Sequence, residues 1–265
     1  MALASFETYI GGRSHLHSWT PRLKLVSLGL LMFAFAAVKH LQLVIPMLGI
    51  TAILYGLSGL PLSFLRRRLR YPGLFILAVV LVLPFGSGET ILAQLGPFAL
   101  RQEGLMMMVL VVSRFLSILT LGFVLLGTTP FLTLLRALRS LGLPTVLADM
   151  TLLTYRYLFE TADMLSTMQK SMHLRGFGHR KRWLRLEGKT LLQLSGLLGT
   201  LLIRSYERSE RIYKAMQLRG YGQLKQAQLV AKQPADSTSL LLTGLSAFVA
   251  TGFVIAEITL SLSIR

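Results

Sequence analysis

Long apolar runs alternate with short polar connections along most of this chain, and five of them have the character of membrane-spanning helices. A helix needs about 20 apolar residues to cross the hydrocarbon core of a bilayer, and only helices satisfy their backbone polar groups within one segment there. The pattern therefore predicts an all-α, polytopic membrane protein with about five transmembrane helices. The expected spans are residues 22–39, 41–60, 72–86, 104–126 and 240–262.

The third run is less regular than the others. Pro84 and the glycines at 86 and 88 interrupt it, so the helix either ends there or extends toward residue 95. The following stretch, 91–99, is compatible with either alternative.

A sixth apolar stretch, residues 187–203, is a candidate span. Arg204 leaves its apolar run too short to cross a bilayer. We expect this stretch to be buried against a neighbouring helix or on the bilayer surface.

Residues 127–239 are too numerous for a simple connector and predict a cytoplasmic region of one short and two long helices. An apolar stripe from Phe131 to Leu141 predicts a short helix in the membrane interface. A helical pattern from Pro144 to Arg175 predicts a long helix of roughly 45 Å at 1.5 Å per residue, and a second long helix is expected over 187–218. The predicted organisation is therefore residues 1–126 with four spans, the cytoplasmic region 127–239, and residues 240–265 with the last span.

Positive charge is distributed very unevenly among the predicted loops. Of the 28 Lys and Arg residues, 24 lie in the N-terminal segment, in the loop after the second span, or in 127–239. The positive-inside rule then places the N-terminus and 127–239 in the cytoplasm and the C-terminus outside. Attraction of basic residues to anionic lipid headgroups gives the same topology.

Composition narrows the function classes. Hydrophobic residues make up 53% and charged residues 15% of the chain, and the mean hydropathy is +0.60, values typical of a membrane protein. The net charge of +17 is compatible with nucleic-acid binding, but the apolar runs favour the lipid bilayer as partner and no nucleic acid. Cysteine is absent, which excludes disulfides and thiolate metal sites. The polar first twenty residues predict no cleavable signal peptide.

Two nearly identical octapeptides, 44 residues apart, end the two predicted long helices. They are Ser-Met-His-Leu-Arg-Gly-Phe-Gly from Ser171 and Ala-Met-Gln-Leu-Arg-Gly-Tyr-Gly from Ala215. In each, an arginine occupies the last turn and a glycine is expected to end the helix in the left-handed conformation. One such end could be simple helix punctuation, since a helix C-terminus favours a cation. Its repetition predicts a duplicated docking site.

These motifs resemble those of the transmembrane (T) component of energy-coupling factor transporters, in particular the CbiQ type of cobalt importers. The resemblance rests on the paired Arg-Gly helix ends between four N-terminal spans and a last one, and on the segment from His15 to Lys24 before the first span. The family signature is usually Ala-Arg-Gly, whereas Leu174 and Leu218 stand at its first position here.

The resemblance implies a multi-pass transport subunit of a bacterial or archaeal cytoplasmic (inner) membrane that is not itself an enzyme. Two ATP-binding cassette subunits would bind ATP-Mg, and no cofactor is expected in this chain. A separate substrate-binding membrane subunit, with or without a small accessory membrane subunit, would bind the cargo, cobalt by family resemblance and nickel or a vitamin as alternatives. The expected ATPase-docking residues are Leu174, Arg175, Gly176, Leu218, Arg219 and Gly220.

Other chemistry has weak support in the sequence. Gly188-Lys189-Thr190 imitates the end of a phosphate-binding loop, but Trp183 stands where its first glycine is required. The pairs His15/His17 and His173/His179 and the run Met106–Met108 do not have the spacing of a metal site. We therefore predict neither a catalytic constellation nor a metal site in this chain.

Two charges lie inside predicted spans. Burial of Arg114 or Glu257 alone in a bilayer is costly, so we expect both to be structural, with an Arg114 contact inside the bundle that could involve Glu257. A proton-coupled secondary transporter would also need such charges and is the main alternative function.

Overall fold

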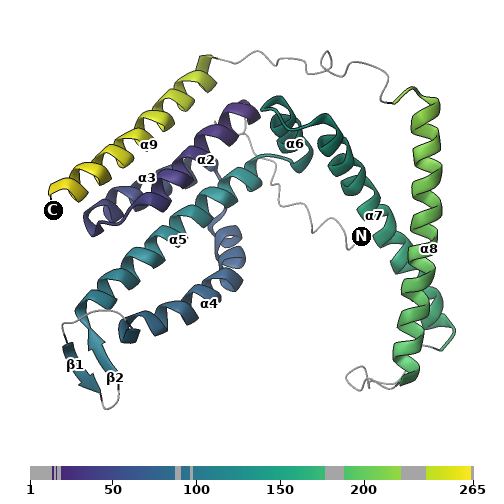
Figure 1. Cartoon of the computed structure of the whole chain (residues 1–265), viewed down its shortest axis with the longest axis horizontal. Coiled ribbons are helices and arrows are strands. Elements are labelled where there is room, and N and C mark those ends of the chain that lie inside the picture. Colours follow the sequence, from purple (N-terminus) through teal and green to yellow (C-terminus); the bar gives the residue numbers. More distant parts are fainter. Residues whose placement is uncertain are drawn as a thin grey trace. The chain divides into compact units, whose positions relative to one another are not determined.

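The structure is a computed structural model that describes residues 14, 16, 19–86, 91–95, 98–176, 188–221 and 237–263. These residues fall into two compact units. The first, called here the membrane bundle, contains the helices α2 to α6, a β-hairpin and α9; the second, the helix pair, contains α7 and α8 (Figure 1). The elements are α2 (Pro21–Ala37), the 3₁₀ turn η2 (Leu41–Leu43), α3 (Val44–Ser58), α4 (Leu62–Gly86), β1 (Ile91–Leu95), β2 (Phe98–Arg101), α5 (Gln102–Thr128), α6 (Phe131–Ser140), α7 (Thr145–Leu174), α8 (Gly188–Leu218) and α9 (Ser237–Ser263).

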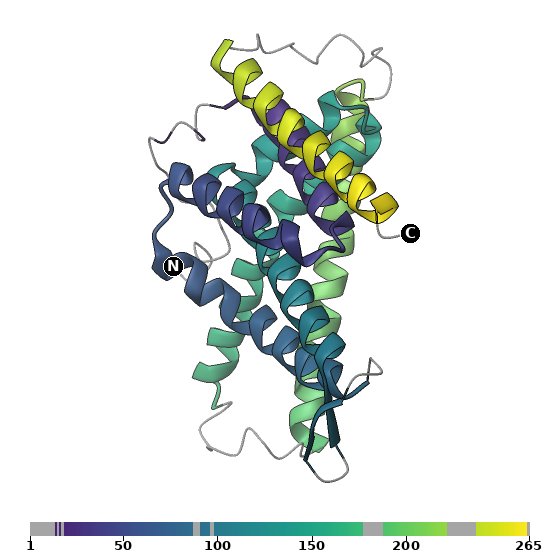
Figure 2. The same ribbon diagram turned by 90° about the vertical axis from the view of Figure 1, so that its left-hand side faces the viewer.

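The first and last helices of the membrane bundle lie side by side and run in the same direction (Figures 1 and 2). At their starts, the Trp19 indole donates to the Thr243 hydroxyl at 3.2 Å, and the backbone N–H of Thr20 donates to Ser239 Oγ at 3.2 Å. Further along, the rings of Phe35 and Phe253 meet edge to face with centroids 5.2 Å apart. The N-terminal ends of α2 and α9 therefore lie on the same face of the bundle.

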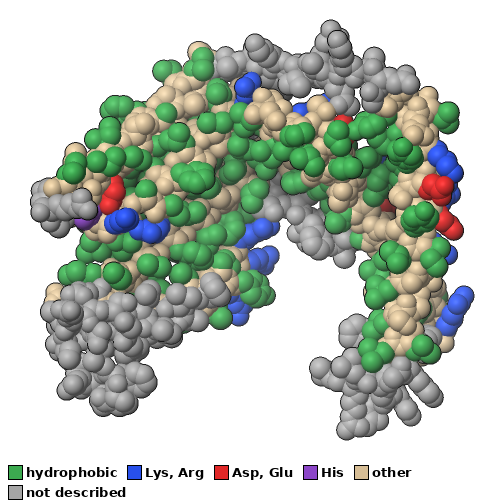
Figure 3. Space-filling model, in the orientation of Figure 1, with side chains coloured by type: hydrophobic (Ala, Val, Ile, Leu, Met, Phe, Trp, Pro, Cys, Tyr) green, Lys and Arg blue, Asp and Glu red, His purple; other side chains and the backbone are tan. Residues whose placement is uncertain are grey.

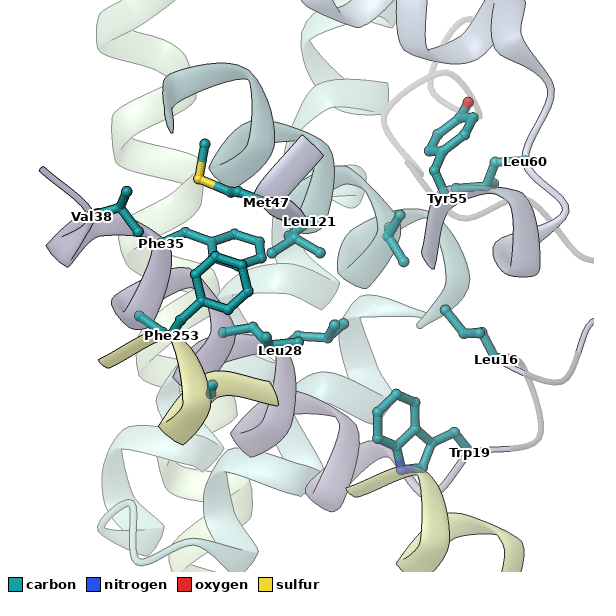
Figure 4. Packing of buried hydrophobic residues seen from close by; sticks show 14 residues of the cluster. Leu16, Trp19, Leu28, Phe35, Val38, Met47, Tyr55, Leu60, Leu121 and Phe253 are labelled. Atoms are coloured by element: carbon teal, nitrogen blue, oxygen red, sulfur yellow. The ribbon is translucent and has the colours of Figure 1, made fainter. Parts of the chain in front are cut away.

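The core of the bundle is built from α2, α3, α5 and α9. Phe35 and Leu28 of α2, Met47 of α3 and Leu121 of α5 are completely buried and lie around the ring of Phe253 (Figure 4). Outside this core, large apolar side chains such as Phe33 and Phe248 are exposed, and hydrophobic side chains cover much of the visible face of these helices (Figure 3). Such a surface fits a lipid environment.

All five predicted spans fall on helices of the bundle, so the all-α polytopic prediction is confirmed. Among the described residues, three segments have the length and hydropathy to cross a membrane: Leu41–Ser58, Gly104–Thr128 and Ser237–Leu262. The other two spans correspond to α2, which has 17 residues, and to α4, whose first half is rich in arginine.

The third span ends at residue 86 as predicted, but it begins earlier. Its helix begins at Leu62, ten residues before residue 72, because the arginines at 66–68 and 70 are good helix formers. The alternative extension toward residue 95 is wrong: Ile91–Leu95 is a strand that pairs antiparallel with Phe98–Arg101. The helix ends at Gly86, because the glycines at 86 and 88 disfavour its continuation.

The predicted cytoplasmic region 127–239 divides between the two units. α6 packs against α2 in the membrane bundle, and the division falls at Gly142, which has a positive φ of 108°. α7 and α8 match the two predicted long helices closely. The helix pair is therefore shorter than the region 127–239.

Candidate functional site

The two Arg-Gly motifs form helix ends of the same construction. Gly176 and Gly220 have positive φ angles of 93° and 72°, which glycine adopts without a steric penalty. The backbone N–H of Gly220 donates to Gln217 O at 2.9 Å and that of Tyr221 to Met216 O at 3.0 Å, the hydrogen bonds of a Schellman motif. At the first motif, the N–H of Gly176 donates to His173 O at 3.1 Å. The predicted left-handed glycine ends are confirmed at both sites.

The side chains at these ends are available to a partner. Leu174 and Leu218 are 88% and 90% exposed, and Arg175 and Arg219 are exposed as well. A leucine at the last turn of a helix contributes little to stability when it is fully in water, whereas it can bury its whole side chain at an interface. Each end thus presents one apolar and one cationic side chain.

Cross-helix contacts show that α7 and α8 run antiparallel. Arg208 of α8 forms an ion pair with Glu160 of α7 at 2.6 Å. Nearer the end of α8, the Tyr221 hydroxyl donates to Asp149 Oδ2 at 3.0 Å, close to the start of α7. The second motif therefore lies beside the beginning of α7, while the first motif lies at its other end.

This arrangement separates the two arginines widely. The rise of α7 between Asp149 and Arg175 corresponds to roughly 40 Å at 1.5 Å per residue. Two sites so far apart on one stiff pair of helices can bind two separate partner molecules at once. They cannot form one shared site for a small ligand.

The apolar first half of α8 is only slightly covered within the helix pair. Leu197 is buried, whereas Leu192, Leu198, Leu202 and Ile203 are exposed. Burial against the other helix, one of the two expected alternatives, is thus limited to a small part of this stretch. The exposed part is an apolar surface of the kind that contacts lipid or another subunit.

The two intramembrane charges have different partners, and both partners belong to the turn that follows α2. The Arg114 guanidinium donates to the carbonyl oxygen of Val38. Glu257 Oε1 lies 3.7 Å from His40 Nε2, and neither carboxylate oxygen accepts a hydrogen bond from the described residues. The expected contact of Arg114 inside the bundle is present, but it is made with a backbone carbonyl and not with Glu257.

A further charged residue, Lys24, was not predicted as structural. Its ammonium group is completely buried and donates to Leu16 O at 2.9 Å, to Thr128 O at 3.5 Å and to Thr128 Oγ1. This contact holds the start of α2 against the end of α5. The only sequence signal was a lysine placed just inside an apolar run.

The structure shows no metal-binding cluster of three or more His, Asp or Glu residues within the ranges that it describes. His15, His17 and His179 lie outside those ranges, and Met106 and Met107 are exposed on α5. Gly188, Lys189 and Thr190 form the first turn of α8.

The chain resembles known transport proteins over most of its length. The model of the CbiQ family, described as cobalt transport protein, matches residues 12–229. The chain is 27% identical over 253 residues to the energy-coupling factor transporter transmembrane protein EcfT of Limosilactobacillus fermentum, covering 89% of this chain and 91% of that protein. It is 29% identical over 215 residues to the cobalt transport protein CbiQ of Rhodobacter capsulatus, covering 77% of this chain and 83% of the relative.

A second EcfT, from Lactococcus lactis, is 29% identical over 245 residues, or 83% of this chain and 87% of that protein. The residues that the family model matches contain the helices α2 to α8. Apolar helices and transport-protein relatives together make the chain an integral membrane protein. Because the family model spans most of the sequence, the chain belongs to the CbiQ family of cobalt transport proteins and is a T component of an energy-coupling factor transporter.

Proposed function

We propose that this coupling subunit docks two ATP-binding cassette subunits, one at Arg175–Gly176 and one at Arg219–Gly220. The observation that carries the proposal is the placement of two like-constructed, exposed helix ends roughly 40 Å apart on antiparallel helices. Two equivalent helix ends at that separation can bind two similar partner subunits. The ATPase subunits bind and hydrolyse ATP-Mg, and this chain contributes no catalytic group.

The chemistry of arginine suits this docking role. The planar guanidinium has five N–H donors and can bridge backbone carbonyls and a carboxylate across a subunit boundary. The neighbouring leucine adds apolar area, and the left-handed glycine lets the chain turn away directly behind it.

Coupling follows from the stiffness of the two helices. When the two ATPase subunits approach or separate, helix ends lodged in each must move with them. α7 and α8 are tied by the Glu160–Arg208 ion pair, so movement at one end is transmitted along both. We propose that the recipient of this motion is a separate membrane subunit that binds the cargo and contacts the exposed apolar surfaces of α8 and the bundle.

Cobalt is the proposed cargo of the complete complex. The support is the family to which the chain belongs and the relative named as a cobalt transport protein. Nickel or a vitamin would need the same coupling subunit, because the cargo binds to the partner and not to this chain. The complex is proposed to lie in the cytoplasmic membrane with the helix pair on the cytoplasmic side.

Arginine variants test the docking role. In the purified complex, Arg175→Ala and Arg219→Ala should each weaken association with one ATPase subunit by roughly 30-fold or more, since a charge-assisted interface contact typically contributes 2–5 kcal/mol. Arg→Lys should restore binding only partly, because the bidentate geometry is lost. Arg211→Ala, at an exposed position of α8, is the control and should leave binding unchanged.

Normal assembly and ATP-driven uptake in the double alanine variant would show that both motifs only end their helices and do not dock partners. Uptake that proceeds without ATP or the ATPase subunits would instead favour a proton-coupled secondary transporter.

A further inference from the structure

The two Arg-Gly helix ends differ in one side-chain contact, and the difference follows from their sequences. Tyr221, the aromatic residue of the second motif, donates its hydroxyl to Asp149 at 3.0 Å, and Asp149 belongs to the second turn of α7. The first motif has Phe177 at the corresponding position, and phenylalanine has no hydroxyl. The bond at the second end thus depends on a side-chain group that the first copy lacks.

The start of α7 is apolar and exposed around Asp149. Val146 is three residues before Asp149, and Met150 follows Asp149 directly. Val146 and Met150 are four residues apart and share a face of the helix, and Leu147, three residues before Met150, adjoins Met150. All three are about half exposed, whereas Ala148 is buried. At the end of α8, Leu218 and Arg219 are exposed as well.

We propose that the Tyr221–Asp149 hydrogen bond joins the end of α8 and the first turns of α7 into one composite docking surface for the ATPase subunit that binds Arg219. This inference rests on the proposed function and identifies a larger footprint for one of its two sites. The partner surface must offer an apolar groove for Val146, Leu147 and Met150 beside acceptor groups for Arg219. The occupant is the ATPase subunit that binds Arg219, because the Tyr221–Asp149 hydrogen bond brings the start of α7, which carries Val146 and Met150, to the helix end that carries Arg219.

Tyr221 and Asp149 act as positioning residues in this arrangement. A helix end that is tied to a second helix loses less conformational freedom on binding than an end held by its own backbone alone. The second site should therefore bind its ATPase subunit partly through α7, and removal of the tie should weaken that site selectively.

Matched fluorescent reporters can measure the two sites separately on this cysteine-free chain. Ser171 and Ala215 are both exposed and both lie four residues before the arginine of their motif, so Ser171→Cys and Ala215→Cys provide equivalent labels. The full-length protein in lipid nanodiscs is titrated with its cognate ATPase subunits. Tyr206→Phe, at an exposed position of α8, is the control for loss of a tyrosine hydroxyl.

We expect Tyr221→Phe to weaken binding at the Ala215 reporter by about 2- to 10-fold, the usual effect of one hydrogen bond, and to leave the Ser171 reporter unchanged. Met150→Ser should act on the same reporter, and Asp149→Asn, which keeps an acceptor oxygen, should cost less than Asp149→Ala. Tyr206→Phe should affect neither site.

No change with Tyr221→Phe, or an equal change at both reporters, would overturn the composite surface. Arg219→Ala separates this outcome from failure of the proposed function. If Arg219→Ala abolishes binding at the Ala215 reporter while Tyr221→Phe and Met150→Ser do not affect it, docking stands and the composite surface is wrong. If Arg219→Ala also has no effect, the docking role itself is wrong.

Discussion

His40 Nε2 lies 3.7 Å from Glu257 Oε1, which links the turn after α2 to the second half of α9. Arg114 of α5 donates to the carbonyl oxygen of Val38 in the same turn. Charged side chains of α5 and α9 thus both contact the turn after α2. An isolated carboxylate in a bilayer is costly, which accounts for the placement of Glu257 beside the His40 imidazole.

A double-mutant cycle should detect this contact. His40→Ala and Glu257→Gln should each lower the thermal stability of the detergent-solubilised protein, and the double variant should lose less than the sum of the two, with a coupling energy of about 0.5 kcal/mol or more. Glu207→Gln, on exposed α8, serves as the control partner for His40→Ala. Strict additivity of His40→Ala and Glu257→Gln would show that the two side chains do not interact.

Lys24→Met should destabilise the bundle markedly. The substitution keeps a long apolar side chain but removes the ammonium that donates to Leu16 and Thr128. Hydrogen bonds to charged groups contribute about 1.5–3 kcal/mol each, and the acceptors would remain buried without their donor. The midpoint of thermal unfolding measures the loss, and Lys170→Met, at an exposed position of α7, should be close to neutral. Equal midpoints for the two variants would contradict a structural role of Lys24.

Two glycines of α5 should respond oppositely to alanine. A Cβ at Gly127 would lie 3.0 Å from Leu60 Cδ1 and 3.3 Å from Leu60 Cδ2, and Leu60 is buried. A Cβ at Gly122 would meet only Met32 Cε at 3.9 Å. Replacement of glycine by alanine in a helix gains up to about 1 kcal/mol where space allows. Gly122→Ala should therefore raise the unfolding temperature and Gly127→Ala should lower it; a rise in both would show that Leu60 moves freely.

The orientation of the protein can be tested by cysteine labelling. If the helix pair is cytoplasmic, Ser209→Cys should react with a membrane-impermeant reagent only after the cells are opened. A cysteine at position 265 should react in intact cells. Labelling of Ser209→Cys from outside sealed cells would reverse the topology and remove the docking proposal with it.

Cobalt uptake tests the proposed cargo. Cells that carry the complete complex should accumulate cobalt faster than cells that lack only this chain, whereas nickel or vitamin uptake should differ less. The same cells with the Arg175→Ala/Arg219→Ala variant provide a control for protein insertion. Equal cobalt uptake with and without the chain would exclude cobalt as the cargo.

The sequence predicted the helices well where periodicity and end signals agree. The Arg-Gly ends of α7 and α8 are the clearest case. An arginine followed by a glycine indicates a helix end, and the backbone hydrogen bonds that form this end are local in sequence. The β-hairpin after α4 was less accessible, since a short apolar run is compatible with strand or helix until its pairing partner is known.

Long-range contacts were beyond prediction for a different reason. Asp149 and Tyr221 are 72 residues apart, and Lys24 and Thr128 are 104 residues apart, so nothing local to any of these residues indicates its partner. The two intramembrane charges illustrate the same limit. Their position in apolar runs predicted that each needs a partner, but only the packing of α5 and α9 on the turn after α2 determines which.

The pairing of α2 with α9 has a consequence for biosynthesis. The hydrogen bonds from Trp19 and Thr20 to α9 bridge 224 and 219 residues of sequence, so the ribosome must reach Thr243 and Ser239 before they can form. Until then the face of α2 that carries Phe35 lacks its neighbour Phe253. α7 and α8 are synthesised before α9, so the Arg-Gly ends exist before the bundle closes. Insertion of the early helices and completion of the bundle thus occur at different times during synthesis of the chain.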